Sequence, residues 1–447
     1  MSANNLTALA LLSLLAASTA ASGQGLGNSP YSRLGLGDFN PNTGGIRQQG
    51  MGGVGLAAPN AVQVNDLNPA LVYYTNRTTY EAAFTGQYKE LRSATASQRV
   101  GSGNLGYLAL AIPISRRWAV SAALRPLTTV DYKTQQAGTL TGGGQTAQLL
   151  TEYTGTGGLS EVAVSQGIRL AKGLSLGLTS SYVFGSIDRS TAVLVVPETL
   201  RAGEVLKRVA VTDHVQYNDF LFRTGLHYRF EASKKLAVNV AGVYTFQSKL
   251  SGTRTQRQDE QDINGTSFLV APVEISSQSG STVLPSSWQG GLSLDNNKNW
   301  SLSADVAAYQ WSKYRDFGVS RTNDVALTNT TRVGLGGELT PDPASVTNYF
   351  KRVAYRVGVS VAQLPYRPGG EQLYDRAVSW GFSLPFPTAS PLDATTLNLA
   401  FTYGQRGNDK VVGGSGGERQ ANIKENYLRA QVGVSLNNRW FLKRRIE

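Results

Sequence analysis

A strict alternation of apolar and other residues runs through the segment from Tyr427 to Leu436. Every second residue from Leu428 onward is apolar, and the residues between them are polar, aromatic or glycine. Because successive side chains of a β-strand point to opposite faces, such a strand has one apolar face and one wet face. The apolar face then meets either a second sheet, as in a soluble sandwich, or lipid, as in a membrane barrel.

Fourteen segments carry this alternation, and their connections are alternately short and long. Short turns at one end and long loops at the other are typical of a single-chain outer-membrane barrel. Unstructured loops longer than about 15 residues are uncommon in soluble domains. We therefore predict an all-β fold, a 14-stranded antiparallel transmembrane β-barrel in the bacterial outer membrane. The segments are 77–91, 104–114, 117–131, 159–171, 173–187, 214–230, 235–248, 285–295, 299–312, 330–339, 351–364, 376–386, 394–406 and 425–437, and the long polar links are 132–158, 188–213, 249–284, 313–329 and 407–424.

The composition favours lipid as the solvent of the apolar faces. Charged residues are only 16% of the chain, and glycine occurs 49 times. The mean hydropathy of −0.20 excludes a helical membrane protein, but it suits a barrel in which half of the strand residues face water. Aromatic residues such as Trp118, Trp300 and Trp380 stand near segment ends, as in the girdles of outer-membrane barrels.

The N-terminus reads as a secretory leader followed by a plug. Residues 6–17 are an apolar run before small residues, so we predict a signal peptide over 1–23 rather than a buried helix. Residues 24–76 are glycine-rich and barely charged, which favours a hatch that plugs the lumen over a disordered tail. The barrel then covers 77–437, and 438–447 form a basic periplasmic tail.

The remaining motifs support neither catalysis nor a cofactor. Gly50 to Gly55 spell G-x-G-x-x-G, but without a preceding strand or a later acid this favours a tight coil over a nucleotide site. There is no cysteine, and only His214 and His227 could serve a metal or a catalytic triad. We predict no enzyme, no metal and no cofactor.

The net charge of +12 comes from cations that are scattered along the sequence. Nucleic acid is therefore not an expected partner, and a basic lumen wall and contact with anionic lipid headgroups fit better. The alternation predicts these lumen-facing polar residues: Arg223, His227, Arg229, Asp305, Arg356 and Arg429.

The chain resembles the FadL-like family of outer-membrane transporters for long-chain fatty acids and other hydrophobic compounds. The resemblance rests on the leader, the fourteen strands and a hatch that ends in Asn68-Pro69-Ala70, together with the Ser29–Arg33 and Lys424–Tyr427 segments. It implies passive uptake of a hydrophobic small molecule, with Asn68, Pro69 and Ala70 at the hatch or gate. The expected surroundings are the lipid bilayer and lipopolysaccharide.

Two functions remain open from the sequence. One is passive uptake of hydrophobic small molecules such as long-chain fatty acids. The other is a non-transporting barrel subunit of an outer-membrane protein assembly or secretion complex, with outer-membrane partners. A lipid-hydrolysing barrel is a weaker third alternative. An apolar pocket beside a wall kink would favour uptake, whereas a polar lumen packed without a cavity would favour the subunit.

Overall fold

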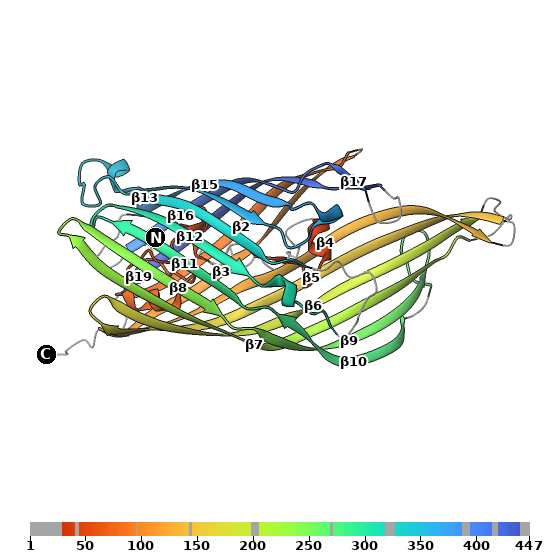
Figure 1. The fold of residues 1–447 in the computed structure, drawn as a ribbon, viewed down its shortest axis with the longest axis horizontal. Coiled ribbons are helices and arrows are strands. Elements are labelled where there is room, and N and C mark those ends of the chain that lie inside the picture. The colour runs from red at the N-terminus through yellow and green to blue at the C-terminus, as the bar shows by residue number, and fades with distance from the viewer. Residues whose placement is uncertain are drawn as a thin grey trace, which may run out of the picture.

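The computed structural model describes residues 29–40, 44–94, 96–142, 145–197, 205–268, 271–317, 327–386, 394–413 and 419–438 (Figure 1). The predicted signal peptide and residues 439–447 of the predicted tail lie outside these ranges. The described strands form one antiparallel sheet that closes on itself, because β19 (Lys424–Asn438) pairs with β2 (Thr78–Arg92) along its length. Figure 1 shows the result, a long barrel of tilted strands.

Fourteen strands make up the wall of this barrel in the described part of the chain, which confirms the predicted fold class. β8 and β9 act as one interrupted strand, and so do β10 and β11, because β11 pairs with β8 and β10 pairs with β9. The wall strands between β2 and β19 are β3 (Ser97–Ser115), β4 (Trp118–Gly142), β5 (Gln145–Ala171), β6 (Leu174–Pro197), β7 (Arg208–Ser233), β8 (Leu236–Thr245), β9 (Ser248–Gln261), β10 (Val273–Leu284), β11 (Ser287–Asp295), β12 (Trp300–Tyr309), β13 (Thr330–Leu339), β14 (Ala354–Gln363), β15 (Tyr374–Phe386) and β16 (Ala394–Arg406).

Smaller elements lie in the connections. The loop between β16 and β19 contains the hairpin β17 (Val411–Gly413) and β18 (Arg419–Ala421). Three short 3-10 helices occupy other connections: η4 (Trp311–Lys313), η5 (Tyr349–Arg352) and η6 (Pro368–Gly370). No helix in the described ranges has the length and apolarity needed to cross a membrane.

The outward face of the wall is an apolar belt. On β7, Phe220, Phe222 and Leu226 are 45% to 50% exposed, whereas His227 between the outward positions is fully buried. Residues of this size are rarely left in water in such numbers on one surface. The belt is therefore the lipid-facing surface of an outer-membrane barrel, and the period-two alternation of the sequence is the cause of it.

Several wall strands are much longer than predicted. β4 to β7 run for 24 to 27 residues, whereas about 9–11 residues suffice to cross a bilayer. The interpretation of 132–158, 188–213 and 249–284 as long loops was therefore wrong over most of their length. Parts of these segments, such as residues 135–140, are exposed on both faces, which removes the hydrophobic alternation. Their backbones still pair in antiparallel ladders such as Gln136↔Thr151. Figure 1 shows these strands extending beyond the rest of the wall.

Residues 29–40 and 44–76, here called the N-terminal segment, lie inside the barrel. The segment contains η2 (Pro30–Arg33), β1 (Asp38–Phe39), α2 (Ile46–Gln49) and η3 (Pro69–Tyr74). Leu36 is buried in an apolar cluster with inward-facing residues of β4 to β10, including Val130, Leu159 and Ile187. Ile46 packs against small wall residues, including Ala83 and Ala123. These two clusters fix the segment against two different parts of the wall.

Inward-facing glycines let the backbone of the segment touch the wall. A Cβ built on Gly358 of β14 would lie 2.1 Å from the carbonyl carbon of Met51, and one on Gly336 of β13 would lie 2.1 Å from the Met51 oxygen. Carbon atoms in contact are about 3.5–4.0 Å apart, so no larger residue fits at either position. The glycines on the wet face of the strands thus mark contacts with the segment.

Substitution Gly358→Val tests this contact. We expect it to destabilise the folded barrel by at least the 1–3 kcal/mol typical of overpacking, because the valine would collide with Met51. The measurement is the temperature at which the barrel loses its compact migration in detergent gels. Gly86→Val is the control, since a Cβ there meets no atom within 4 Å. An equal loss in both variants would contradict the assignment.

Candidate functional site

An apolar cavity of about 310 Å³ lies in the lumen beside the N-terminal segment. Residues 34–40 of the segment form one side of it, and Leu221 and Leu284 of the wall form another. Trp311 and Tyr314, which follow β12, contribute aromatic rings. Such a concave, mostly apolar space with a few polar groups at its margin is the usual form of a small-molecule site. The charged residues at the margin are Asp38, Arg125, Glu161, Arg223, Asp305, Arg332, Asp375 and Arg406.

Most of these marginal charges are compensated within the protein. Arg406 lies 2.9 Å from Asp38, 3.6 Å from Asp375 and 3.8 Å from Glu425. Arg223 and Arg332 differ, because they donate to backbone carbonyls. Arg223 donates to the Asp66 oxygen at 3.1 Å, and neither arginine has a carboxylate within ion-pair distance among the described residues. These two guanidinium groups remain able to receive an anionic group.

The wall is incomplete between β3 and β4 beside this cavity. The two strands pair only from Leu108↔Leu124 to Ser115↔Trp118, although both continue far beyond the Leu108↔Leu124 pair. The stretch beyond that pair, where β3 and β4 are not paired with each other, is here called the β3–β4 seam. β1 takes the free edge of β4 instead, since Asp38 and Phe39 pair with Thr129 and Thr128. Pro126 has no N–H to donate, and the β4–β5 register shifts next to it. The seam is therefore closed by the N-terminal segment rather than by a neighbouring wall strand.

Asn40 completes this closure. Its N–H donates to the Leu127 oxygen at 2.9 Å, and its side-chain amide donates to the Pro126 oxygen at 3.2 Å. Both carbonyls would otherwise face a gap in the wall, where an unpaired polar group costs several kcal/mol in lipid. Phe39, Asn40 and Leu127 also line the cavity. The contacts that close the seam thus belong to the wall of the cavity itself.

A second break in the wall faces the same cavity. β7 pairs with β8 up to Arg223↔Thr245 and resumes with β9 only at Tyr217↔Gly252. In the interval the Asp219 carboxylate accepts from the Ser251 N–H at 3.0 Å and from its hydroxyl at 2.9 Å. A side chain therefore replaces missing ladder bonds at this kink.

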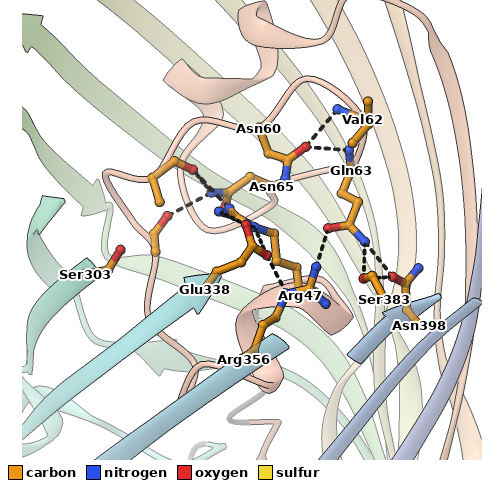
Figure 2. Close-up of polar contacts among 12 residues, drawn as sticks. Arg47, Asn60, Val62, Gln63, Asn65, Ser303, Glu338, Arg356, Ser383 and Asn398 are labelled. Carbon is orange, nitrogen blue, oxygen red and sulfur yellow. Dashed lines mark hydrogen bonds and ion pairs between the residues drawn. The ribbon is translucent and has the colours of Figure 1, made fainter. Parts of the chain in front are cut away.

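Below the cavity a buried ion-pair network ties the segment to the wall (Figure 2). Glu338 of β13 accepts from Arg47 of α2 at 3.1 Å and also from Arg356 of β14. Gln63 continues the network, because it accepts from Arg356 at 3.3 Å and donates to Asn398 at 2.7 Å. Figure 2 shows these side chains converging from α2, from the coil at residue 63 and from the wall. This part of the lumen thus holds a polar network beside the apolar contacts of Ile46.

Two further anchors lie at the same level. Arg125 pairs with Asp66 of the segment and, at 2.6 Å, with Glu161, which stands opposite it in the β4–β5 register. The Asp305 carboxylate accepts from the backbone N–H groups of Gly55 and Leu56 at 2.8 and 2.9 Å. Charge-assisted bonds of this kind are about twice as strong as neutral ones.

At the other end of the segment Tyr31 holds η2 in place. It stacks on Tyr366 with ring centroids 5.1 Å apart, and its hydroxyl donates to the Ile423 oxygen. Burial raises the pKa of the Tyr31 hydroxyl above its usual range, and the nearby Glu425 carboxylate acts in the same direction. The hydroxyl therefore stays protonated, as its donor role requires.

The predicted hatch residues Asn68, Pro69 and Ala70 lie together at the start of η3. Asn68 is fully buried, caps η3 by accepting from the Ala70 N–H at 2.9 Å and donates to the Leu56 oxygen at 3.1 Å. Pro69 and Ala70 lie against Gly177 of β6, where a Cβ would be 2.2 Å from the Ala70 nitrogen. Their local role is thus to seat η3 on the wall.

The six residues predicted to face the lumen occupy different levels of it. Arg223, Asp305 and Arg356 contact the N-terminal segment as described above. His227 lies edge-on to Tyr74 of η3 at 5.3 Å, and Arg229 pairs with Asp295 at 2.8 Å near the end of the barrel. Arg429 donates to Gln87 at 3.3 Å on the neighbouring strand. Only part of the predicted set therefore borders the cavity.

Sequence reasoning missed the residues that carry the strongest contacts. Arg47, Glu338, Arg125 and Glu161 were not singled out, although the last three occupy positions on the wet face of their strands. A glutamate in the run Gly334, Gly336, Glu338 was the available signal, since an acid at an inward position needs a cation opposite. One partner, Arg356, stands opposite Glu338 in the register and was among the predicted lumen-facing residues. The other partner, Arg47, could not be found in this way, because it lies 291 residues away in a segment without strand alternation.

Replacement of Glu338 by glutamine tests the network. We expect a loss of about 3–5 kcal/mol in the stability of the segment–wall contact, because two buried guanidinium groups lose their carboxylate. Limited proteolysis near Arg47 and the thermal unfolding temperature measure it. Glu90→Gln is the control, since its pair with Arg99 is exposed and 3.9 Å long. Unchanged protease resistance in Glu338→Gln would contradict the prediction.

Comparison with solved structures shows the FadL-like fold. The structure of the CymD monoaromatic hydrocarbon channel is 18% identical, with a TM-score of 0.53 over 91% of this chain and 100% of that one. A Pseudomonas aeruginosa FadL homologue is 13% identical, with a TM-score of 0.55 over 90% and 99%. The P. putida toluene transporter TodX is 13% identical, with a TM-score of 0.53 over the same shares.

Comparison of the sequence itself gives the family. No curated protein matches the chain. The model of one protein family, described as BamG, matches residues 6–447, which is nearly the whole sequence. The chain therefore belongs to the BamG family.

Proposed function

We propose that the chain lets hydrophobic small molecules pass between the outer side of the barrel and the bilayer through the cavity and the β3–β4 seam. The observation that carries this proposal is that Phe39 and Asn40 both line the apolar cavity and close the gap in the wall. A ligand in the cavity would reach lipid once β1 leaves the edge of β4.

The chemistry of the lining suits an apolar ligand. The cavity has room for a small molecule, and most marginal charges are already paired. Arg223 and Arg332 could receive a carboxylate, so long-chain fatty acids are a candidate class. The solved structures of similar fold include a monoaromatic hydrocarbon channel and a toluene transporter, which supports an apolar cargo. Asn68, Pro69 and Ala70 would act in this scheme as the seat of a plug that closes the periplasmic half.

A disulfide across the seam tests the route. The chain has no cysteine, so Phe39→Cys and Thr128→Cys introduce one pair at residues that oppose each other in the β1–β4 register. Opposed residues of antiparallel strands are about 4.5–5.5 Å apart between Cα atoms, which a disulfide spans. We expect the oxidised variant to lose uptake of a fluorescent fatty acid or of radiolabelled toluene, and reduction to restore it.

The matched control is a pair inside the continuous wall, Val378→Cys with Tyr403→Cys, which oppose each other in β15 and β16. That disulfide should leave uptake unchanged in both redox states. Equal uptake by the oxidised and reduced seam variant, with the disulfide confirmed by mass spectrometry, would overturn the proposed route.

A second candidate function is a non-transporting subunit of an outer-membrane protein assembly or secretion complex. The contacts on the α2 side of the lumen favour it, because the Arg47–Glu338–Arg356 network ties the N-terminal segment to the wall there. In that case depletion of the chain should lower the amounts of other outer-membrane barrels, and mild-detergent purification should yield a stoichiometric partner. Normal levels of other barrels after depletion would leave transport as the function.

A further inference from the structure

Three consecutive turns at one end of the barrel carry a set of exposed cations. The turns join β3 to β4, β5 to β6 and β7 to β8, at the end where β2 begins and β19 finishes. We call this set the basic rim. It consists of Arg116, Arg117, Arg169, Lys172, Lys234 and Lys235, all of them exposed.

The charges of the basic rim are not neutralised within the protein. Among the described residues, none of the six has a carboxylate within 4.0 Å, although fifteen such pairs occur elsewhere. Glu231 of β7 is an exposed acid beside the rim and forms no ion pair with it. Two of the turns are also joined, because the Arg169 N–H donates to the Arg117 oxygen at 2.8 Å. Within the described part of the chain, the rim is thus a patch of positive charge that takes part in no ion pair.

The lipid-facing belt ends directly beside this patch. Trp118, Ile168, Leu176 and Leu226 oppose one another across β4, β5, β6 and β7, and each is 38% to 48% exposed on the outward face. Arg116 and Arg117 precede Trp118 directly, and Lys172 is four residues beyond Ile168. At about 3.3 Å per residue, these cations lie within roughly 13 Å of the apolar row. Arg116 and Arg117, only two and one residues from Trp118, lie within about 7 Å of the row, which is the depth of the headgroup layer of about 5–8 Å that flanks the hydrocarbon.

We propose that the basic rim binds the anionic headgroup of a phospholipid in the periplasmic leaflet. A phosphodiester at this depth meets the guanidinium groups of Arg116 and Arg117, while its acyl chains lie along Trp118 and Ile168. Continuity with the lipid-facing belt favours lipid over an acidic protein, because a protein would have to approach cations that border hydrocarbon. This proposal does not rest on the proposed transport function, because the basic rim lies outside the cavity and the β3–β4 seam.

Quenching of Trp118 fluorescence by brominated lipids tests the proposal. The full chain is placed in phosphatidylcholine nanodiscs that contain increasing brominated phosphatidylglycerol or, in parallel, brominated phosphatidylcholine. The Trp118→Phe variant gives the quenching of the other tryptophans, which is subtracted to leave the quenching of Trp118. We expect phosphatidylglycerol to bind at the site about fivefold or more tightly than phosphatidylcholine. A single cation facing an anionic headgroup contributes about 1 kcal/mol, which corresponds to that ratio.

The variant Arg116→Gln/Arg117→Gln/Lys172→Gln should lose this preference, with unchanged heat-dependent gel migration showing that it still folds. The control Arg99→Gln/Lys207→Gln/Lys410→Gln removes the same charge from exposed residues at the opposite end and should keep it. Equal quenching by both lipids, or an equal loss in both triple variants, would overturn the proposal. Displacement of phosphatidylglycerol by added poly-L-glutamate would also overturn it, in favour of an acidic protein.

Discussion

Saturation of backbone hydrogen bonds in lipid is the constraint on which the rest of this structure depends. A wall exposed to hydrocarbon cannot leave N–H and C=O groups unpaired, so the sheet must close, and β19 returns to β2. Strand pairing is interrupted at two places in the wall, and there other groups must satisfy the backbone. At the β3–β4 seam the missing partner is supplied by β1 and Asn40, and at the β7–β9 break it is supplied by the Asp219 carboxylate. Both places border the apolar cavity, so the two departures from continuous strand pairing lie beside the space that could hold a ligand.

Much of the fold could be predicted from the sequence because the two faces of each strand meet different solvents. The alternation at Phe220, Phe222 and Leu226 located β7 correctly, and the fourteen strand positions followed from the same period. The outer parts of the strands could not be found in this way. In stretches such as residues 135–140 both faces are exposed, so backbone pairing continues without a hydrophobic signal.

The site was less predictable, for a different physical reason. An inward position such as Glu338 can be recognised from the period, but its partner Arg47 comes from a segment that has no period at all. The glycines at 336 and 358 lie at inward positions, but the sequence does not show that they admit the backbone of Met51. Arg117, Lys172 and Lys235 are likewise far apart in the sequence, which shows only scattered cations. Only the up-and-down topology gathers them into one rim, because alternate turns all return to the same end.

The position of residues 44–76 inside the lumen also constrains how the molecule is made. This segment precedes the first wall strand, and its contacts reach β13, β14 and β15 on the far side of the barrel. Because α2 lies against late strands around Gly358, these contacts can form only after the C-terminal half of the wall exists. The segment is therefore synthesised long before the partners on which its native position depends. Its final packing is a late event of folding, although it precedes the whole wall in the chain.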